Sequence, residues 1–446
     1  MDIEGFVKRR IENGMEKERI IQELVEAISE FKNWDYEKRK AFAGEVIAEA
    51  EISENYKDRG ELIEMILSTH ETDVKMGEFG VGSRGEGDFF VHRKIAEIIE
   101  ETGAIVGPKE QDDAGVVRAG KSYITVAVDG MHSRLSDFPF LAGFHASRAT
   151  LRDIYVMGSR PVALTSDLHL SDDGDVGKLF DFTAGVSLVG ELTSTPLVAG
   201  STLRVGGDMV FGSRLVAGVG AVGVSEEMPK ARKNAEAGDV ILVAEGYGGG
   251  TISTIAIYHG FYDVVRETLN VDFMLACNAL MESRYFPEVH SLIDITNGGL
   301  RGDAHEISTT SNKKLVFYES EIYKTVNPRV LKMLEELEID PLGISTDALM
   351  IILPEDYSKD ILKTLEGVAK IYEVGRVEKG SGVYMESEKK LKKLESKFRE
   401  ASYTKVKKFI GESYPEEFDN MKDRIEKSVE LTLQKKKMIK EFIIRR

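Results

Sequence analysis

The chain has 446 residues, 42% of them hydrophobic and 30% charged, which is enough for two or three domains with separate cores. Its formal net charge of −17 argues against nucleic acid or an anionic membrane as a main partner, because both require a basic surface. No apolar run approaches the roughly 18 residues of a membrane span and no signal peptide opens the chain, so we expect a cytoplasmic protein.

Residues 1–74 are predicted to form a helical N-terminal extension. Ile20, Ile21, Leu24 and Ile28 recur at helical spacing, and two further segments of the same kind follow them. No constellation of catalytic side chains occurs there. A role in packing or oligomerisation is therefore favoured over that of a lid on a substrate.

A glycine-rich stretch, MGEFGVGSRGEGDFF, comes next and leads into a helix. Glycines expose backbone N–H groups that, together with the positive end of a helix, can hold phosphate. The Rossmann interpretation of its G-x-G-x-x-G spacing fails, because helical sequence precedes it where a buried strand is required. We predict nucleotide contacts, with a flexible domain boundary as the alternative; the candidate glycines are Gly80, Gly82, Gly85 and Gly87.

Residues 115–122 match the P-loop pattern G-x-x-x-x-G-K-[ST] residue for residue. A P-loop requires a helix after the lysine, whereas Lys121 and Ser122 lead into YITVAV, which alternates and is β-branched. We therefore predict a β-hairpin at this position and interpret the P-loop match as accidental.

Four aspartates around this hairpin, Asp112, Asp113, Asp129 and Asp153, lie in or beside apolar runs. Because burying an unpaired charge is costly, these carboxylates need a partner. Oxygen donors that converge from separate elements suggest Mg²⁺ held beside a phosphate ligand. Asp153 adds to this argument, since it lies near the end of a helix closed by Gly158, where the helix dipole disfavours an acid.

Strands and helices then alternate in two successive regions, which predicts an α/β (or α+β) fold. The first domain is placed at residues 75–227 and the second at residues 237–385. In the second domain a strand ends at DIT and a glycine pair opens a helix, a layout that suits phosphate; the residues concerned are Asp294, Thr296, Asn297 and Gly298. The only cysteine, Cys277, lies in an apolar stretch, so a buried core position is favoured over a catalytic thiol.

The end of the chain is predicted to contain a hairpin and then helices. KIYEVGRVEKGSGVY has the alternation of two strands around a glycine turn. Residues 386–446 are charged and read as a helical C-terminal extension, with Leu391, Leu394 and Phe398 forming one apolar stripe.

In the order of these motifs, residues from about 80 to 385 resemble the aminoimidazole ribonucleotide (AIR) synthetase-related, or PurM-like, family. That family includes formylglycinamidine ribonucleotide synthetase, selenophosphate synthetase, thiamine-monophosphate kinase and the hydrogenase maturation protein HypE. The matching segments are Gly85-Glu86, Asp112-Asp113-Ala114, Asp129-Gly130, LRDIYVMGSRP, PLVAGSTLR and DITNGGL.

The resemblance implies two α/β domains, with the N-terminal domains of two subunits pairing into a β-barrel. It also implies a homodimer that binds ATP and Mg²⁺ between its domains and acts on a small-molecule substrate. By position, the metal ligands would be Asp113, Asp129, Asp153 and Asp294, the first three being catalytic. The nucleotide contacts would be Gly80, Gly82, Gly85, Gly87, Asp112, Thr202, Arg204, Thr296, Asn297 and Gly298.

Two departures from the family pattern reduce the number of carboxylates. The family's Gly-Gly-Asp-Thr is Ala-Gly-Ser-Thr here, with Ser201 at the acidic position, and Asn297 replaces an Asp of the kinase branch. Asp208 is a possible substitute for the first loss. No cysteine lies near the glycine-rich stretch or at the C-terminus, which disfavours the selenophosphate synthetase and HypE functions.

Two functions follow from these observations. The first is an ATP- and Mg²⁺-dependent enzyme that phosphorylates a small molecule, or activates an amide or carboxylate oxygen as a phosphate intermediate. The second is a nucleotide-binding regulator or assembly factor that kept the fold and lost turnover. His132 and His145 follow Asp129 and are either substrate contacts or ordinary core and surface histidines, the latter being favoured.

Overall fold

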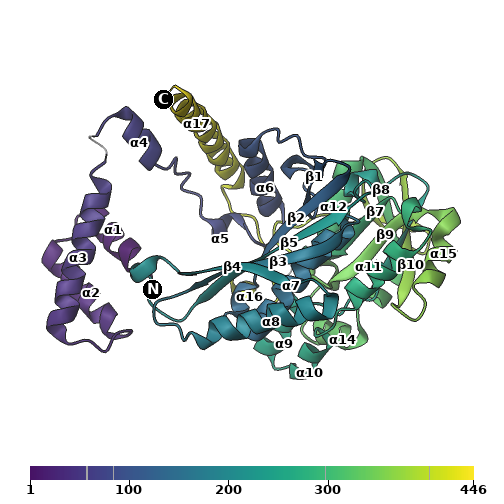
Figure 1. Cartoon of the computed structure of the whole chain (residues 1–446), viewed down its shortest axis with the longest axis horizontal. Helices are drawn as coiled ribbons and strands as arrows, with labels where there is room; N and C mark the ends of the chain where they lie inside the picture. Colours follow the sequence, from purple (N-terminus) through teal and green to yellow (C-terminus); the bar gives the residue numbers. More distant parts are fainter. Residues whose placement is uncertain (57–58, 84, 297, 401, 446) are drawn as a thin grey trace.

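The computed structural model describes residues 1–56, 59–83, 85–296, 298–400 and 402–445. Two β-sheets form the body of the molecule, and helical segments from both ends of the chain lie at its periphery (Figure 1). Within the described ranges, we find no helix long and apolar enough to cross a bilayer.

The N-terminal sheet has five strands in the order β1-β2-β5-β3-β4, with β3 and β4 parallel and the other neighbours antiparallel. Helices α7 and α8 pack together on one face. The bounds are β1 Gly115–Ala119, β2 Ser122–Gly130, β3 Arg160–Leu170, β4 Leu197–Arg204, β5 Leu215–Ser225, α7 Pro139–Val156 and α8 Gly177–Thr193. The opposite face carries exposed valines, among them Val126, Val128 and Val216.

The region that matches a P-loop is a hairpin, as predicted. Strands β1 and β2 pair antiparallel, and Ala119 opposes Ser122 across a turn in which Gly120 has a φ of +63°. Helix α7 also ends as predicted, because Gly158 adopts a left-handed φ of +74° just beyond it.

The C-terminal sheet has seven strands in the order β12-β11-β8-β10-β6-β9-β7. Alternate residues of β6 enter different cores: Val240 and Leu242 face helices α7 and α11, whereas Ile241 and Val243 face α12. The strands are β6 Asp239–Ala244, β7 Ser291–Ile295, β8 Lys313–Tyr318, β9 Ala348–Pro354, β10 Ile371–Lys379, β11 Gly382–Ser387 and β12 Lys390–Lys393. The helices are α9 Gly250–His259, α10 Tyr262–Glu267, α11 Asp272–Glu282, α12 Gly299–Ser311, α13 Glu319–Ile322, α14 Pro328–Glu336 and α15 Ser358–Thr364.

The predicted closing hairpin is wrong. Strands β10 and β11 do follow one another across a short glycine turn, but β8 lies between them and pairs with both. The same turn signal suits either arrangement, and the long-range pairing of β8 decides between them.

The apolar stripe predicted after residue 386 is also wrong. Leu391 lies in β12, which pairs with β11, and Glu388 and Lys389 form the intervening turn with positive φ. Leu394 packs on the core of the C-terminal sheet, whereas Phe398 enters a separate cluster. The three residues therefore do not share one helix face.

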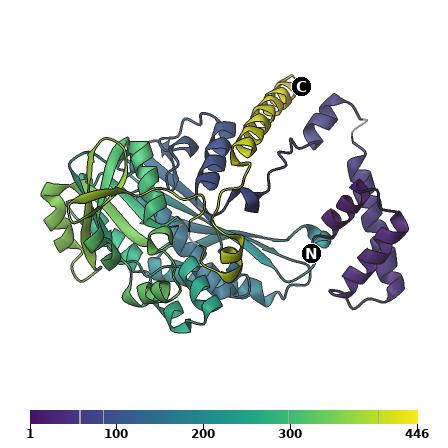
Figure 2. The ribbon, with the colours of Figure 1, turned by 180° about the vertical axis from the view of Figure 1, so that it is seen from behind.

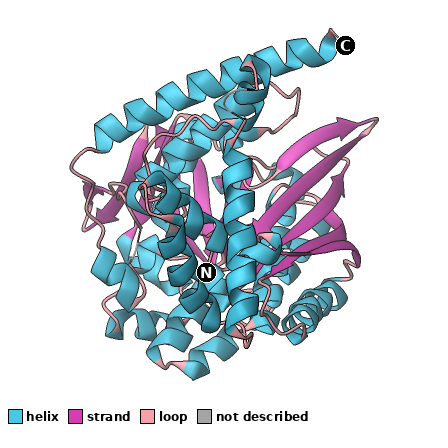
Figure 3. Cartoon of the chain, turned by 90° about the vertical axis from the view of Figure 1, so that its left-hand side faces the viewer, coloured by secondary structure: helices cyan, strands magenta, loops and turns pink. Residues whose placement is uncertain are grey.

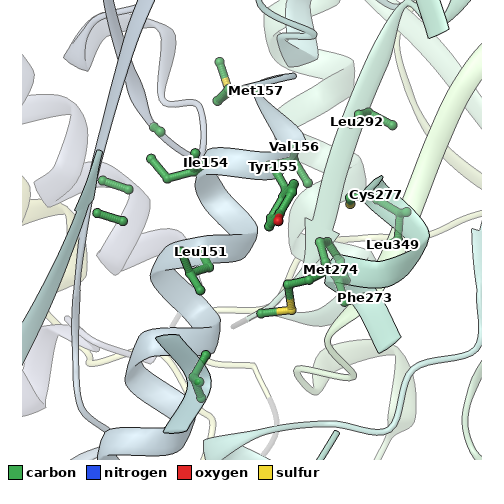
Figure 4. Close-up of a cluster of buried hydrophobic side chains, with 14 of the residues drawn as sticks. Leu151, Ile154, Tyr155, Val156, Met157, Phe273, Met274, Cys277, Leu292 and Leu349 are labelled. Atoms are coloured by element: carbon green, nitrogen blue, oxygen red, sulfur yellow. The ribbon is translucent and has the colours of Figure 1, made fainter. Parts of the chain in front are cut away.

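One continuous core joins the two sheets. Figure 4 shows Leu151 and Ile154 of α7 in this core, with Met274 of α11 and Leu349 of β9 from the other side. Helix α7 therefore packs against the C-terminal unit as well as its own sheet, and this packing fixes the end of α7 relative to β7.

The peripheral segments are α1 Ile3–Glu12, α2 Lys17–Ser29, α3 Tyr36–Glu54, α4 Glu61–Leu67, α5 Met76–Phe79, α6 Glu86–Ile99, α16 Lys405–Ile410 and α17 Phe418–Ile444. Helices α1–α3 stand apart from the body and meet it near Phe211, at the tip of the N-terminal sheet (Figure 2). Helix α17 runs along the edge of the molecule to the C-terminus (Figure 3). It contacts α6 and α4.

The glycine-rich stretch and the C-terminal extension meet in a cluster of four buried apolar side chains, which we call the terminal cluster. Its members come from α5, from the segment before α16 and from α17: Phe79, Phe398, Phe418 and Met421. The glycine-rich stretch is thereby held by the C-terminal extension.

Candidate active site

A cavity of about 520 Å³ opens where the end of α7, the first turn of α9 and strands β2 and β7 come together. Six of the predicted site residues line it: Asp112, Asp113, Asp129, Asp153, Asp294 and Thr296. The structure thus brings together carboxylates that are far apart in the sequence, from Asp112 to Asp294.

Separate elements present these carboxylates. Asp113 lies two residues before β1, Asp129 is the penultimate residue of β2, and Asp153 occupies the last turn of α7. Asp294 lies in β7, a strand whose five residues are all buried. Because α7 packs on both sheets, its last turn is held against the end of β7.

These carboxylates lie in an environment that disfavours negative charge. Burial raises the pKa of Asp153 well above its usual range, and the neighbouring Asp129 and Asp294 raise it further. Burial likewise raises the pKa of Asp113, against the opposing effect of Arg232. Such a group of acids favours any bound cation.

Two arginines supply part of the missing positive charge. Arg152, next to Asp153 on α7, is buried and donates from Nε to Asp294 at 3.0 Å and from Nη1 to Asp347 at 2.6 Å. Burial alone would lower the pKa of Arg152, but these two carboxylates raise it. Arg152 therefore ties the N-terminal unit to two strand ends of the C-terminal unit.

Arg232, in the segment between the two units, also pairs with carboxylates, on the other side of the cavity. Its guanidinium binds Asp113 and Glu306 and lies 3.2 Å from Asp303 Oδ1, while its backbone N–H donates to Asp112 at 2.9 Å. Three elements are thus joined through one buried cation.

The donor set fits a divalent metal ion. Asp113 Oδ2 and Asp294 Oδ1 are buried without a hydrogen-bond partner, although the other oxygen of each carboxylate binds an arginine. Carboxylate oxygens are the ligands that Mg²⁺ prefers. Among the described residues, no three acidic, His or Cys side chains already enclose a metal position, because Arg152 and Arg232 hold two of the aspartates.

The described residues of the glycine-rich stretch do not line this cavity. One of its four predicted glycines, Gly82, lines a second cavity that adjoins the first. The predicted contact Gly298 lines this second cavity too. A Cβ at Gly85 would lie 1.9 Å from the Phe398 carbonyl oxygen, and one at Gly87 would lie 1.9 Å from the Phe79 carbonyl oxygen. In this structure Gly80, Gly85 and Gly87 allow close packing in and around the terminal cluster, which is a different use of glycine from the predicted phosphate contact.

Thr202 and Arg204 also lie outside the cavity. Strand β4 is the edge strand, three strands away from β2, which corresponds to about 14 Å at 4.8 Å per strand. Arg204 instead pairs with Asp172 and Asp208, so Asp208 does not replace the carboxylate lost at Ser201 within this subunit. The predicted contact Asn297 lies outside the described residues.

The sequence interpretation missed four charged residues of the site: Arg152, Arg232, Glu306 and Asp347. Arg232 and Glu306 belong to no motif, so no local signal pointed to them. Asp347 lies just before β9 with a φ of +54°, and a Cβ at Gly249 would lie 2.2 Å from its carboxylate oxygen. Glycine at position 249, the middle of three consecutive glycines at 248–250, is therefore needed for the close approach to Asp347.

Both histidines line the cavity. His145 is buried, and its Nε2 lies 2.9 Å from Ser253 Oγ. His132 lies 2.9 Å from the Tyr403 hydroxyl and 3.1 Å from Thr254 Oγ1. Burial, with Lys407 and Arg134 nearby, lowers the pKa of His132 to about 4, so the ring is neutral at pH 7.

Comparison with known proteins agrees with this architecture. The family model for the N-terminal domain of AIR synthase related proteins matches residues 111–225, and the model for their C-terminal domain matches residues 236–387. The chain belongs to the AIR synthase related family. It therefore has the mixed α/β, two-domain, PurM-like fold that the motifs predicted.

Three individual matches place the chain within this family. An uncharacterized protein of Methanocaldococcus jannaschii is 52% identical over 99% of this chain and 98% of its own length. Thiamine-monophosphate kinase of Pyrococcus horikoshii is 27% identical over 64% of this chain and 87% of its own. The solved structure of AaThiL complexed with AMPPCP and TMP has a TM-score of 0.55 at 18% identity, covering 72% of this chain and 99% of that one.

Proposed function

We propose that this AIR synthase related protein is an ATP- and Mg²⁺-dependent enzyme. It would phosphorylate a small molecule, or activate an amide or carboxylate oxygen as a phosphate intermediate. The observation that supports this most directly is the convergence of Asp113, Asp129, Asp153 and Asp294 in one cavity, with two buried carboxylate oxygens left without a hydrogen-bond partner. An ATP-using kinase and a structure that holds an ATP analogue among its relatives add support.

The cavity has an apolar end and an acidic end, which suits a nucleotide. Ile95 and Ala96 of α6, Pro108, and Val126 and Val128 of β2 line the apolar end, where we place the base. The phosphates would then lie toward the aspartates. Mg²⁺ bound there would neutralise phosphate charge and hold the γ-phosphate in line for transfer.

The chain's own residues would position the reactants and balance charge. Asp113 and Asp294 would hold the metal through the oxygens that the arginines leave unbound. Arg152 and Arg232 would keep the two domains at a fixed separation and offset the remaining acids. Phosphoryl transfer depends mainly on positioning and charge stabilisation, so no covalent nucleophile is required.

A homodimer is part of this proposal. The face of the N-terminal sheet opposite α7 and α8 is uncovered, and Val126, Val128 and Val216 on it are half or more exposed. A second copy packed on this face would bury those valines and complete the apolar end of the nucleotide cavity.

The alternative is a nucleotide-binding regulator or assembly factor without turnover. It is favoured by the arginine pairs, because Arg152 and Arg232 already bind carboxylates that the metal would need. The serine at position 201, where the family has an acid, points in the same direction.

Calorimetry with ATP, with and without Mg²⁺, and then an ADP-release assay over a panel of metabolites would test both functions. We expect Mg²⁺-dependent binding of ATP, and ADP release with at least one acceptor. Asp113→Asn and Asp129→Asn should each abolish Mg²⁺-ATP binding, whereas Asp181→Asn on the outer side of α8 should not. Tight binding without turnover on any acceptor would support the regulator, and binding that survives both site substitutions would contradict the site.

A further inference from the structure

A second cavity, of about 390 Å³, adjoins the carboxylate cavity. The two share four lining residues, Gly130, His132, Thr251 and Ser345, so the cavities meet at these residues. A cavity of this size fits a small molecule and is too small for a macromolecular segment of any length.

The two cavities have opposite charge. Seven carboxylates line the first, whereas Glu400 is the only acid among the described residues that line the second. Both oxygens of Glu400 are already bound, one by Arg301 at 2.6 Å and the other by the Lys397 N–H at 3.3 Å. Glu400 therefore does not neutralise the bases around it.

Two bases of the second cavity have no acidic partner among the described residues. The Arg134 guanidinium lies over the ring of Tyr258 at 4.2 Å, and Lys407 Nζ lies over the ring of Tyr403 at 3.8 Å, but neither forms an ion pair with a carboxylate. Each aromatic ring orients the cation but does not neutralise its charge. In a chain with a net charge of −17, two unpaired bases on one cavity are unexpected.

Burial and the neighbouring cations Arg134 and Arg399 lower the pKa of Lys407 to about 8. An anion between Arg134 and Lys407 would relieve this repulsion. The geometry and the charge thus favour the same kind of ligand.

The C-terminal extension builds one wall of this cavity. Tyr403, Thr404 and Lys407 come from it, and Tyr403 binds His132, one of the shared residues. These residues lie beyond residue 387, where the match to the family's C-terminal domain ends. The wall is therefore an addition that the two-domain core does not supply.

We propose that the second cavity binds the acceptor substrate, a small molecule with a carboxylate or phosphate group, and that Arg134 and Lys407 bind this oxyanion. The term acceptor rests on the proposed function, in which ATP occupies the carboxylate cavity. For phosphoryl transfer, the reactive oxygen of the acceptor would have to extend past the shared residues Gly130, His132, Thr251 and Ser345 into the carboxylate cavity.

Calorimetry on the full chain with two probes, inorganic phosphate and succinate, tests the proposal. Each is titrated with and without Mg²⁺ and a non-hydrolysable ATP analogue, so that binding in the first cavity is separated from binding in the second. We expect at least one probe to bind with the analogue present. The probe that binds more tightly identifies the acceptor's anionic group as phosphate or carboxylate.

Arg134→Gln and Lys407→Met should each weaken that binding by about 10- to 100-fold, as expected for loss of a charge-assisted contact. Arg134→Lys should retain part of it, because the charge remains. The matched control is Lys405→Met, on an exposed position of the same helix, which should leave probe affinity unchanged. None of these substitutions should change the affinity for the nucleotide analogue.

Binding of neither probe to the unsubstituted chain would overturn the proposal, as would unchanged probe affinity in the Arg134→Gln, Lys407→Met double variant. Failure of the proposed function looks different. In that case the nucleotide analogue does not bind. Phosphate or succinate still binds in the absence of the analogue, and the double variant still loses this binding.

Discussion

Replacing Arg152 by Met should destabilise the protein and, at the same time, strengthen its binding of Mg²⁺. Arg152 is buried and holds Asp294 at 3.0 Å and Asp347 at 2.6 Å. Removing one member of a buried ionic group leaves the others uncompensated, which typically costs about 3–5 kcal/mol. Because Asp294 would also lose a competing cation, its oxygens would become more available to a metal.

Urea denaturation with EDTA and then with excess Mg²⁺ measures both effects. In EDTA the free energy of unfolding should fall by about 3–5 kcal/mol. Excess Mg²⁺ should restore part of this loss, by about 2.7 kcal/mol at 100 times its dissociation constant. Arg160→Met is the matched control: Arg160 is exposed and 4.0 Å from Glu282, so its loss should cost less than about 1 kcal/mol.

The double variant Arg152→Met, Asp294→Asn separates charge from packing. If the loss arises from uncompensated charge, removing one of the two acids should recover part of the stability in EDTA, and the recovery by Mg²⁺ should shrink. The reasoning is refuted if Arg152→Met costs less than about 1 kcal/mol in EDTA, or if Mg²⁺ stabilises the variant no more than it stabilises the original chain.

Three further predictions concern the proposed dimer, the second cavity and the terminal cluster. Val128→Lys places a charge on the uncovered face of the N-terminal sheet and should shift the protein toward monomer in sedimentation velocity; an exposed lysine on α3, Lys40→Glu, should not. Affinity for succinate, whose two carboxylates stay ionised over this range, should fall about tenfold between pH 7 and pH 9, because Lys407, with a pKa of about 8, loses its proton. The neighbouring His132 and Tyr403, with pKa values of about 4 and about 12, do not titrate in that range. Lys407→Met should show no such fall. Phe398→Ala should cost about 3–5 kcal/mol in the terminal cluster, and hydrogen exchange should speed up at residues 80–90 and 398–410 together; faster exchange in only one of these segments would contradict the coupling.

The fold could be predicted well wherever local signals and long-range pairing agree. The β1–β2 hairpin and the end of α7 followed from alternation, the turn and Gly158, and the structure has both. The predicted β10–β11 hairpin failed because a turn signal does not reveal that β8 inserts between the two strands. The prediction of an apolar helical stripe after residue 386 failed for the same reason, because it did not include the pairing of β12 with the edge of β11.

The sequence pointed to the acidic residues of this cavity but not to its basic residues. The aspartates were recognisable because an acid in an apolar run needs a partner, and Asp113, Asp129, Asp153 and Asp294 do share one cavity. Arg232 could not be found this way, since an arginine between two domains has no distinguishing pattern. The glycine-rich stretch shows a second limit: glycine serves both phosphate contact and close packing, and in this structure Gly85 lies against the Phe398 backbone.

The position of the C-terminal extension explains why the family motifs do not identify the substrate. The glycine-rich stretch and the extension support each other: the Glu86 N–H donates to the Lys397 carbonyl at 3.2 Å, and the Glu400 N–H donates to the Ser83 carbonyl at 3.3 Å. Together they close the side of the second cavity where Lys407 lies. The motif aspartates line the carboxylate cavity, whereas part of the wall proposed to contact the acceptor comes from a segment with no motif. Selectivity for the acceptor can therefore change through the extension while the aspartates stay the same.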